Sequence, residues 1–138
     1  MNLTKDIVLE EKNKLIFPSK IFINGDYQES VSEKSFDNIS PIDGKITNKI
    51  SFSQKEDVDL AVRVARKTFE SGVWSKADPS HRKKVLLRFA DILERHQLEL
   101  SLLDTIDVGK TINDTYNSDI PASVDNIRWY AEIIDKIY

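Results

Sequence analysis

The chain has 138 residues, no cysteine, 31% charged residues and a formal net charge of −3. Its length and its 40% hydrophobic content suit one ordinary folded domain and not a disordered chain. The lack of cysteine excludes disulfides, thiolate metal sites and a cysteine nucleophile. Because the charges of both signs are interspersed, no basic field is available for a nucleic-acid backbone, and we expect no nucleic-acid partner.

The N-terminal 20 residues predict neither an export signal nor a membrane anchor. Acidic residues interrupt the apolar stretch, and no small-residue cleavage site follows it. No apolar run in the chain approaches the length of about 20 residues that spans a bilayer. We therefore expect no membrane partner and a cytoplasmic location.

Helical and extended patterns alternate in the first third of the chain. Helix-like spacing of apolar residues predicts a short amphipathic helix within residues 3–16. Asn24-Gly25, between two apolar segments, predicts a hairpin with a type I′ turn. Extended segments at 34–41 and 46–53 flank a turn with Asp43-Gly44 at its tip. Together these segments predict a small antiparallel β-meander.

The first long helix is predicted to begin at Ser53, which has the spacing of a capping box with Glu56. Gly72 is the expected end of this helix. Apolar residues recur along it at intervals of three and four, which predicts a buried stripe. The stripe consists of Val58, Ala61, Val62, Ala65 and Phe69.

The second helix is predicted to start with Asp78 as its cap and Pro79 in its first turn. Its predicted buried face consists of Val85, Leu86, Phe89, Ile92 and Leu93. A basic row on the other side is expected to be a solvated surface. That row consists of Arg82, Lys83, Lys84 and Arg88.

Two further helices are predicted. One runs from about Gln97 to Asp107, and the last begins near Ser118-Asp119 with Pro121 in its first turn. The expected buried side of the last helix consists of Val124, Ile127, Tyr130, Ile134 and Ile137.

These elements predict an α+β fold: an N-terminal helix in residues 1–19, a β-meander in 20–52 and a cluster of four helices in 53–138. We expect the helical cluster to be more ordered than residues 1–50, because an isolated hairpin is marginal in water. Truncating Phe89 to alanine is expected to cost about 3–5 kcal/mol. The predicted core consists of Val62, Phe69, Leu86, Phe89 and Leu103.

No catalytic centre is visible in the residue pattern. The four glycines are isolated, so neither a P-loop nor a dinucleotide-binding motif occurs, and no serine has the neighbours of a nucleophile elbow. His81 and His96 are 15 residues apart without a carboxylate pattern, which argues against a zinc site.

Six segments occur in the chain in this order: "IFINGDY", "FDNISPIDGKI", "DVDLAVRVARKTFESGVWS", "RKKVLLRFADILERHQLEL", "LDTIDVGK" and "IRWYAE". Together they resemble the N-terminal portion of the aldehyde dehydrogenase superfamily. The run "DIPASVDNIRWYAEIIDKIY" is most similar to the bacterial branch that oxidises γ-glutamyl-γ-aminobutyraldehyde in putrescine breakdown.

The resemblance implies that residues 1–138 are an incomplete N-terminal segment of an NAD(P)-dependent aldehyde dehydrogenase, the first part of its α/β fold. The family's nucleophilic cysteine, general-base glutamate and most of its cofactor site come later. We therefore expect no catalytic or cofactor-binding residue here, no tight binding of NAD or NADP, and no activity of this chain alone. The implied partner is the remainder of such a chain or a homologous subunit, and a homo-oligomer is possible. The alternative is a stand-alone interaction module that binds a full-length homologue.

The resemblance also implies a structural monovalent cation. Asp107 matches the family's coordinating aspartate, although valine replaces the usual threonine or asparagine after it. Ile39, with its neighbour Asn38, matches the segment that supplies a backbone carbonyl. Hard cations prefer oxygen ligands, and a cation at a helix C-terminus would offset the helix dipole. The alternative is that Asp107 is a helix-end residue bonded to nearby amides.

The resemblance places two further groups in the last helix. Asp119 and Ala122 match the segment that borders the family's aldehyde tunnel. Trp129 and Tyr130 are expected to pack against the absent catalytic domain.

Overall fold

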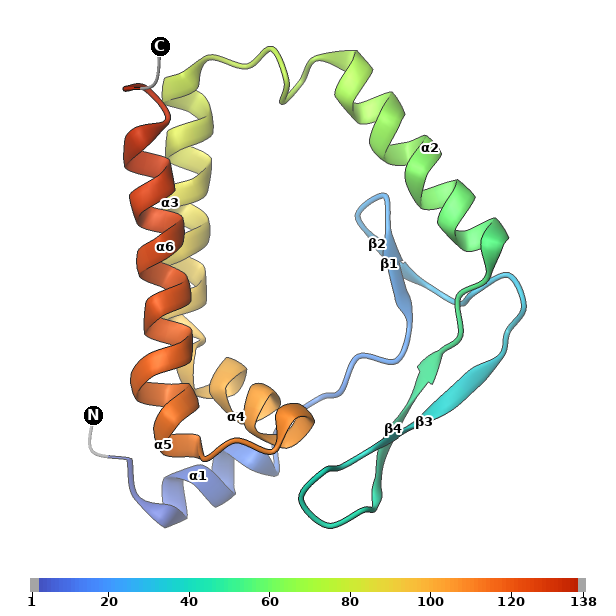
Figure 1. The fold of residues 1–138 in the computed structure, drawn as a ribbon, viewed down its shortest axis with the longest axis vertical. Helices are drawn as coiled ribbons and strands as arrows, with labels where there is room; N and C mark the ends of the chain where they lie inside the picture. The colour runs from blue at the N-terminus through green and yellow to red at the C-terminus, as the bar shows by residue number, and fades with distance from the viewer. Residues whose placement is uncertain (1–2, 137–138) are drawn as a thin grey trace. The chain divides into compact units, whose positions relative to one another are not determined.

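The computed structural model describes residues 3–136. The chain divides into two compact units. The hairpin unit comprises residues 17–77, and the helical unit comprises the residues up to 16 and from 78 onward. Helices together with small antiparallel strand pairs confirm the α+β prediction (Figure 1). In this division, the first long helix belongs with the strands, and the N-terminal helix belongs with the later helices.

The first hairpin pairs β1 (Ile21–Ile23) with β2 (Asp26–Gln28), with Phe22 opposite Tyr27. Asn24 and Gly25 both have positive φ angles, 59° and 89°. A type I′ turn requires this conformation at its two central residues, so the predicted turn is confirmed.

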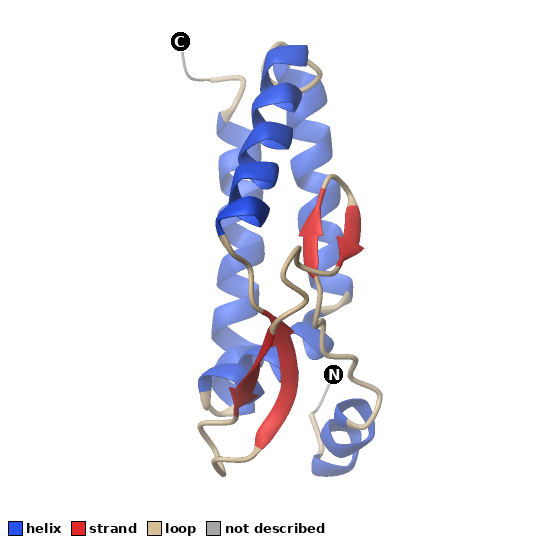
Figure 2. Cartoon of the chain, turned by 90° about the vertical axis from the view of Figure 1, so that its right-hand side faces the viewer, coloured by secondary structure: helices blue, strands red, loops and turns tan. Residues whose placement is uncertain are grey.

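The second hairpin pairs β3 (Ser35–Ile39) with β4 (Ile46–Ser51) and has an irregular register between Asn38 and Ile39. The two hairpins are separate two-stranded sheets and not one continuous meander (Figure 2). The segment that connects the two hairpins is hydrogen-bonded to the helix that follows them, since the Val31 amide donates to Asp57 Oδ1 at 2.9 Å.

Helix α2 (Lys55–Ser71) is capped one residue later than predicted. The capping box consists of Gln54 and Asp57, and the Gln54 amide donates to Asp57 Oδ2 at 2.9 Å. Asp57 is 2% exposed and holds both this amide and that of Val31. Gly72 ends the helix with φ 80°, as predicted.

The predicted stripe of α2 is on the wrong side for a core. Val62 and Phe69 are each 61% exposed, so their prediction as core residues is wrong. A neighbouring row of the same helix, which shares only Ala61 with the predicted stripe, is half-buried, and α2 contacts β1. That row consists of Leu60, Ala61 and Val64.

The helical unit contains α1 and two long helices, α3 and α6, that pack on each other. The shorter helix α4 comes between these two in the chain. Thr4 caps α1, and Asp78 caps α3 by accepting from the Ser80 amide at 2.8 Å, as predicted. Helix α3 packs along α6, and α1 contacts α4. The elements are α1 (Lys5–Lys12), α3 (Pro79–Arg95), α4 (Gln97–Val108), α5 (Ile112–Asp114), the π-helix η1 (Thr115–Asp119) and α6 (Ile120–Ile133).

The buried apolar side chains of the described residues all lie in the helical unit: Ala90, Leu102, Ile106, Val124 and Ala131. Small residues dominate where α3 meets α6, since Ala90 and Ala131 are fully buried. Phe89 is 47% exposed and Tyr130 62% exposed, so the prediction of burial is wrong for both. Each side chain is one position from a buried alanine, which turns it about 100° away from the contact. Leu86 and Leu103 are half-buried.

Helix α6 follows Asp119 and has Pro121 in its first turn, as predicted. The short helix α5 precedes it and was not predicted; it begins at Ile112, where the Thr111 hydroxyl accepts from the Asp114 amide. The chain then widens into the π-helix before Pro121. Proline has no amide hydrogen to donate, and it is tolerated in the first turn of a helix, where Pro121 lies. Ile137 lies outside the described residues.

None of the helices in residues 3–136 is both long and apolar enough to cross a membrane.

Candidate functional site

Polar side chains from the end of α4 and from the π-helix lie together, close to the residues that the sequence predicted to be functional. Helix α4 ends where Gly109 adopts φ 78° and donates its amide to the Thr105 carbonyl at 2.9 Å. After this reversal, Lys110 Nζ lies 2.6 Å from Asp119 Oδ2. The pair joins the residue after the α4 cap to the last residue of the π-helix.

The pKa of Lys110 is raised above its usual value, chiefly by its hydrogen bond to Asp119. The negative charges of Asp104 and Asp114 add to this effect. Lys110 is therefore protonated at neutral pH, and its positive charge offsets the negative charges of these three carboxylates.

The π-helix is fixed to α4 by two further contacts. Thr105 Oγ1 and Thr115 Oγ1 are 2.9 Å apart, and Thr115 is fully buried. Gln97 Nε2 donates to the Tyr116 carbonyl at 2.6 Å. These contacts position the start of α6, where Ala122 is exposed. Sequence reasoning missed them, because no local pattern pairs an amide at 97 with a carbonyl at 116.

The predicted cation ligands belong to different units. Asp107 is exposed in the last turn of α4, in the helical unit. Ile39 is 60% exposed at the end of β3, and Asn38 Nδ2 donates to Asn48 Oδ1 at 3.2 Å, both in the hairpin unit. Asp107 and the segment of Asn38 and Ile39 lie in separate compact units, so this cation site stays a prediction.

Within residues 3–136, no three or more His, Cys, Asp or Glu side chains converge in a way that could hold a metal ion. His96 Nδ1 instead lies 2.9 Å from Glu99 Oε2 at the exposed junction of α3 and α4.

Trp129 and Tyr130 are 58% and 62% exposed and stack edge to face, with ring centroids 4.8 Å apart. Their expected packing against a further domain stays a prediction, as does the position of Asp119 and Ala122 beside an aldehyde tunnel.

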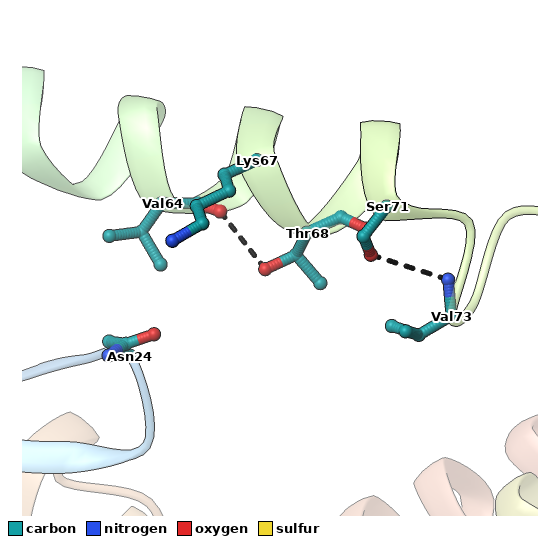
Figure 3. A pocket seen from close by; sticks show the side chains of 6 residues that line it. All are labelled: Asn24, Val64, Lys67, Thr68, Ser71 and Val73. Atoms are coloured by element: carbon teal, nitrogen blue, oxygen red, sulfur yellow. Dashed lines mark hydrogen bonds between the residues drawn. The ribbon is translucent and has the colours of Figure 1, made fainter.

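A hollow of about 280 Å³ lies between the first hairpin and α2. Figure 3 shows Asn24 at the hairpin turn, across from Val64 and Lys67 on the helix. The hydroxyl groups of Thr68 and Ser71 form hydrogen bonds with nearby backbone groups: Thr68 Oγ1 donates to the Val64 carbonyl, and Ser71 Oγ accepts from the Val73 amide. The hollow has no nucleophile–base pair and no acid pair, so its residues do not form a catalytic set.

The order of the elements and their quoted motifs agree with a known family, whose profile is described as "Aldehyde dehydrogenase family". It matches residues 27–138. The chain belongs to the aldehyde dehydrogenase family. The motif series noted in the sequence is thereby confirmed as a family resemblance.

Two curated relatives show how much of the family the chain represents. It is 41% identical over 124 residues to the NADP/NAD-dependent aldehyde dehydrogenase PuuC of Escherichia coli K12, covering 90% of this chain and 25% of that protein. It is 38% identical to the aminoacetaldehyde dehydrogenase of Pseudomonas aeruginosa, with the same coverage of both chains. The chain thus spans about a quarter of the length of these relatives.

Solved structures of aldehyde dehydrogenases also superpose on nearly the whole chain. The γ-glutamyl-γ-aminobutyraldehyde dehydrogenase of Burkholderia cenocepacia superposes with a TM-score of 0.93 at 39% identity, over 98% of this chain and 27% of that one. The aldehyde dehydrogenase KauB of Pseudomonas aeruginosa gives a TM-score of 0.95 at 39% identity, over 99% and 28%.

Proposed function

We propose that this chain is the N-terminal segment of an NAD(P)-dependent aldehyde dehydrogenase that oxidises an aldehyde to a carboxylic acid. One observation carries the proposal: nearly the whole chain superposes on solved aldehyde dehydrogenases, of which it covers little more than a quarter. In such an enzyme, the segment serves as a folded support and supplies no reacting group.

The residues of this chain support that division of labour. It has no cysteine, so the thiolate that attacks the aldehyde carbonyl comes from elsewhere in the assembled enzyme. Its four glycines are isolated, so it offers no glycine-rich loop for the phosphates of a dinucleotide. The residues present therefore do not fit NAD or NADP by themselves.

The proposal is tested by following NADH formation over the purified chain, supplied with γ-glutamyl-γ-aminobutyraldehyde and NAD. We expect no turnover above a protein-free blank. Turnover above that blank would contradict the supporting role. In a second experiment, residues 1–138 replace the matching N-terminal quarter of the Escherichia coli PuuC relative. This chimera is expected to oxidise aldehyde.

For the substrate, we propose γ-glutamyl-γ-aminobutyraldehyde, in putrescine degradation. The support is the last 20 residues of the chain and the likeness to the Burkholderia enzyme of that name. The measurement is kcat/KM of the full-length enzyme for this aldehyde against aminoacetaldehyde and indole-3-acetaldehyde, which appear in the names of similar proteins. A preference for either competitor would contradict this proposal.

We also propose that Asp107 and the backbone carbonyl of Ile39 hold a structural monovalent cation in the complete enzyme, with Asn38 beside them. Carboxylate and carbonyl oxygens are suitable ligands for a hard cation. In the PuuC chimera, potassium should raise the melting temperature, and Asp107→Asn should remove that dependence while Asp104→Asn keeps it. Equal potassium dependence in both variants would assign Asp107 to helix-end bonding alone.

The exposed apolar side chains of α2 favour a second role, that of an interaction module for a full-length homologue. The DNA that follows codon 138 separates the two roles. An in-frame continuation supports the segment of an enzyme, and a stop codon at a clean operon boundary supports the module.

A further inference from the structure

Helix α2 carries two apolar rows on different sides. The inner row, Leu60, Ala61 and Val64, is half-buried, on the helix that contacts β1. The outer stripe consists of Val58, Val62, Ala65 and Phe69, and it contains no charged residue. At 100° per residue, the centres of the two rows are more than 90° apart, so one neighbour cannot cover both.

The outer stripe is exposed within the structure. Val58 is 56% exposed, and Val62 and Phe69 are each 61% exposed. Val62, Ala65, Arg66 and Phe69 line a groove of about 410 Å³. The Arg66 guanidinium carbon lies 5.8 Å from the centroid of the Phe69 ring and borders the groove with a positive charge.

A helix with apolar residues on two sides is typical of a position between two layers. Within the hairpin unit, the first hairpin supplies one of these layers, since α2 contacts β1. We propose that the outer stripe is the docking surface for the remaining three quarters of an aldehyde dehydrogenase polypeptide. The inference rests on the proposed function and adds to it the surface through which the segment joins the rest of the enzyme.

The length of the relatives favours this occupant over a second copy of the chain. The chain covers 25% of the Escherichia coli PuuC relative, so about three quarters of that fold lies outside it and needs contact surfaces. A single row of four side chains offers only a few hundred Å² of apolar area, below the roughly 800 Å² per partner of a standard interface. Covalent attachment removes that requirement, because a linked segment docks at high effective concentration.

The test uses the chimera in which residues 1–138 replace the matching part of the Escherichia coli PuuC relative. Val62→Asp and Phe69→Asp each place a carboxylate in the outer stripe. Arg63→Gln makes the same change of net charge at the adjacent exposed residue, on the polar side of α2. The readouts are soluble yield, melting temperature and NAD-dependent aldehyde oxidation, and circular dichroism of the isolated variant chains checks their fold.

We expect both stripe variants to lower the yield of active chimera by about tenfold or more, because docking would bury an unpaired charge. Arg63→Gln should keep full activity, and all the isolated chains should keep their helix content, since the stripe is exposed in them. Active Val62→Asp and Phe69→Asp chimeras would overturn the inference and leave the proposed function intact. The inference would also be overturned if Val62→Asp dissociated a dimer of the isolated chain while its chimera stayed active, because the stripe would then belong to a second copy. An inactive parent chimera would overturn the proposed function itself.

Discussion

Arg128 Nη2 lies 2.6 Å from Glu94 Oε2 and 3.0 Å from Asp91 Oδ1, so one guanidinium on α6 holds two carboxylates on α3. A second link joins the same helices, where Lys83 Nζ lies 2.6 Å from Glu132 Oε2. The sequence pattern predicts a solvated surface for Lys83, but its side chain is only 23% exposed. Ion pairs thus connect the packed helices α3 and α6 at two places along their length.

The first prediction concerns the pH dependence of this pair. The hydrogen bonds to Arg128 hold the pKa of Glu94 below its ordinary value of 4.5, and they raise the pKa of Arg128. A lowered carboxyl pKa contributes stability that is present above pH 4.5 and is lost as the pH falls through the lowered value. Arg128→Met should therefore reduce the loss of stability on acidification, with a modest fall in melting temperature at neutral pH.

The measurement is thermal unfolding of both proteins across the acid range. Arg88→Met is the control, since it removes the same charge from an exposed position on α3. The same acid dependence in Arg128→Met and in the parent would show that the ion pair contributes nothing to folding.

The second prediction places the core at α4 and not at Phe89. Leu102 is 2% exposed, whereas Phe89 is 47% exposed. Leu102→Ala should lower the free energy of unfolding by about 2–5 kcal/mol, because it leaves a cavity in a packed interior. Phe89→Ala should cost less than Leu102→Ala, which replaces the larger effect expected from the sequence. Urea unfolding followed by circular dichroism compares them, and an equal or larger cost at Phe89 would contradict this core.

Local chemistry predicted the ends of elements well. Asn24-Gly25 has the two positive φ angles of its turn, and Gly72 ends its helix in the left-handed conformation. Asp78 caps α3 as expected. Each of these features depends on residues within one turn of each other, so the sequence alone contains the cause.

Burial could not be predicted in the same way, because it depends on which element covers which face. Periodicity identified the apolar stripe of α2, but Val62 and Phe69 face outward and the neighbouring Leu60–Ala61–Val64 row is half-buried. The contact of α3 with α6 uses the two alanines, Ala90 and Ala131, whose small size matters only once the partner helix is known.

The candidate site shows the same limit. The resemblance pointed to Asp107 and Asp119, yet the contacts that position this region come from Gln97, Thr105 and Lys110. These partners are 9 to 19 residues away from the groups they bind. The π-helix was missed for the same reason, since side chains of α4 fix it from outside its own sequence.

The third prediction concerns Asp57, which is buried and binds two backbone amides, those of Val31 and Gln54. Asp57→Ala should lower the free energy of unfolding by about 2 kcal/mol, because both amides lose their acceptor and α2 loses its cap. Glu56→Ala, at an exposed position in the same turn, should change it by less than about 0.5 kcal/mol. The amide of Val31 should also exchange faster with solvent in Asp57→Ala. Unchanged exchange there would show that the carboxylate does not hold the loop between β2 and β3.

The last prediction concerns the hydroxyl pair that fixes the π-helix. Thr105 Oγ1 and Thr115 Oγ1 are 2.9 Å apart, and Thr115 Oγ1 also lies 3.3 Å from the Ile112 carbonyl. Valine keeps the shape of threonine and removes the hydroxyl, so Thr105→Val and Thr115→Val each remove the hydrogen bond between the two side chains, while in Thr105→Val the Thr115 hydroxyl can still donate to the Ile112 carbonyl. Each single variant should cost about 1 kcal/mol of unfolding free energy. The double variant should cost less than the sum, with a coupling of about 0.5–1.5 kcal/mol, since the second substitution has no shared bond left to break. Hydrogen exchange of residues 115–120 should accelerate in Thr115→Val, because the segment loses its attachment to α4. Additive costs, with unchanged exchange in the segment, would mean that packing and the Gln97 contact alone hold the π-helix.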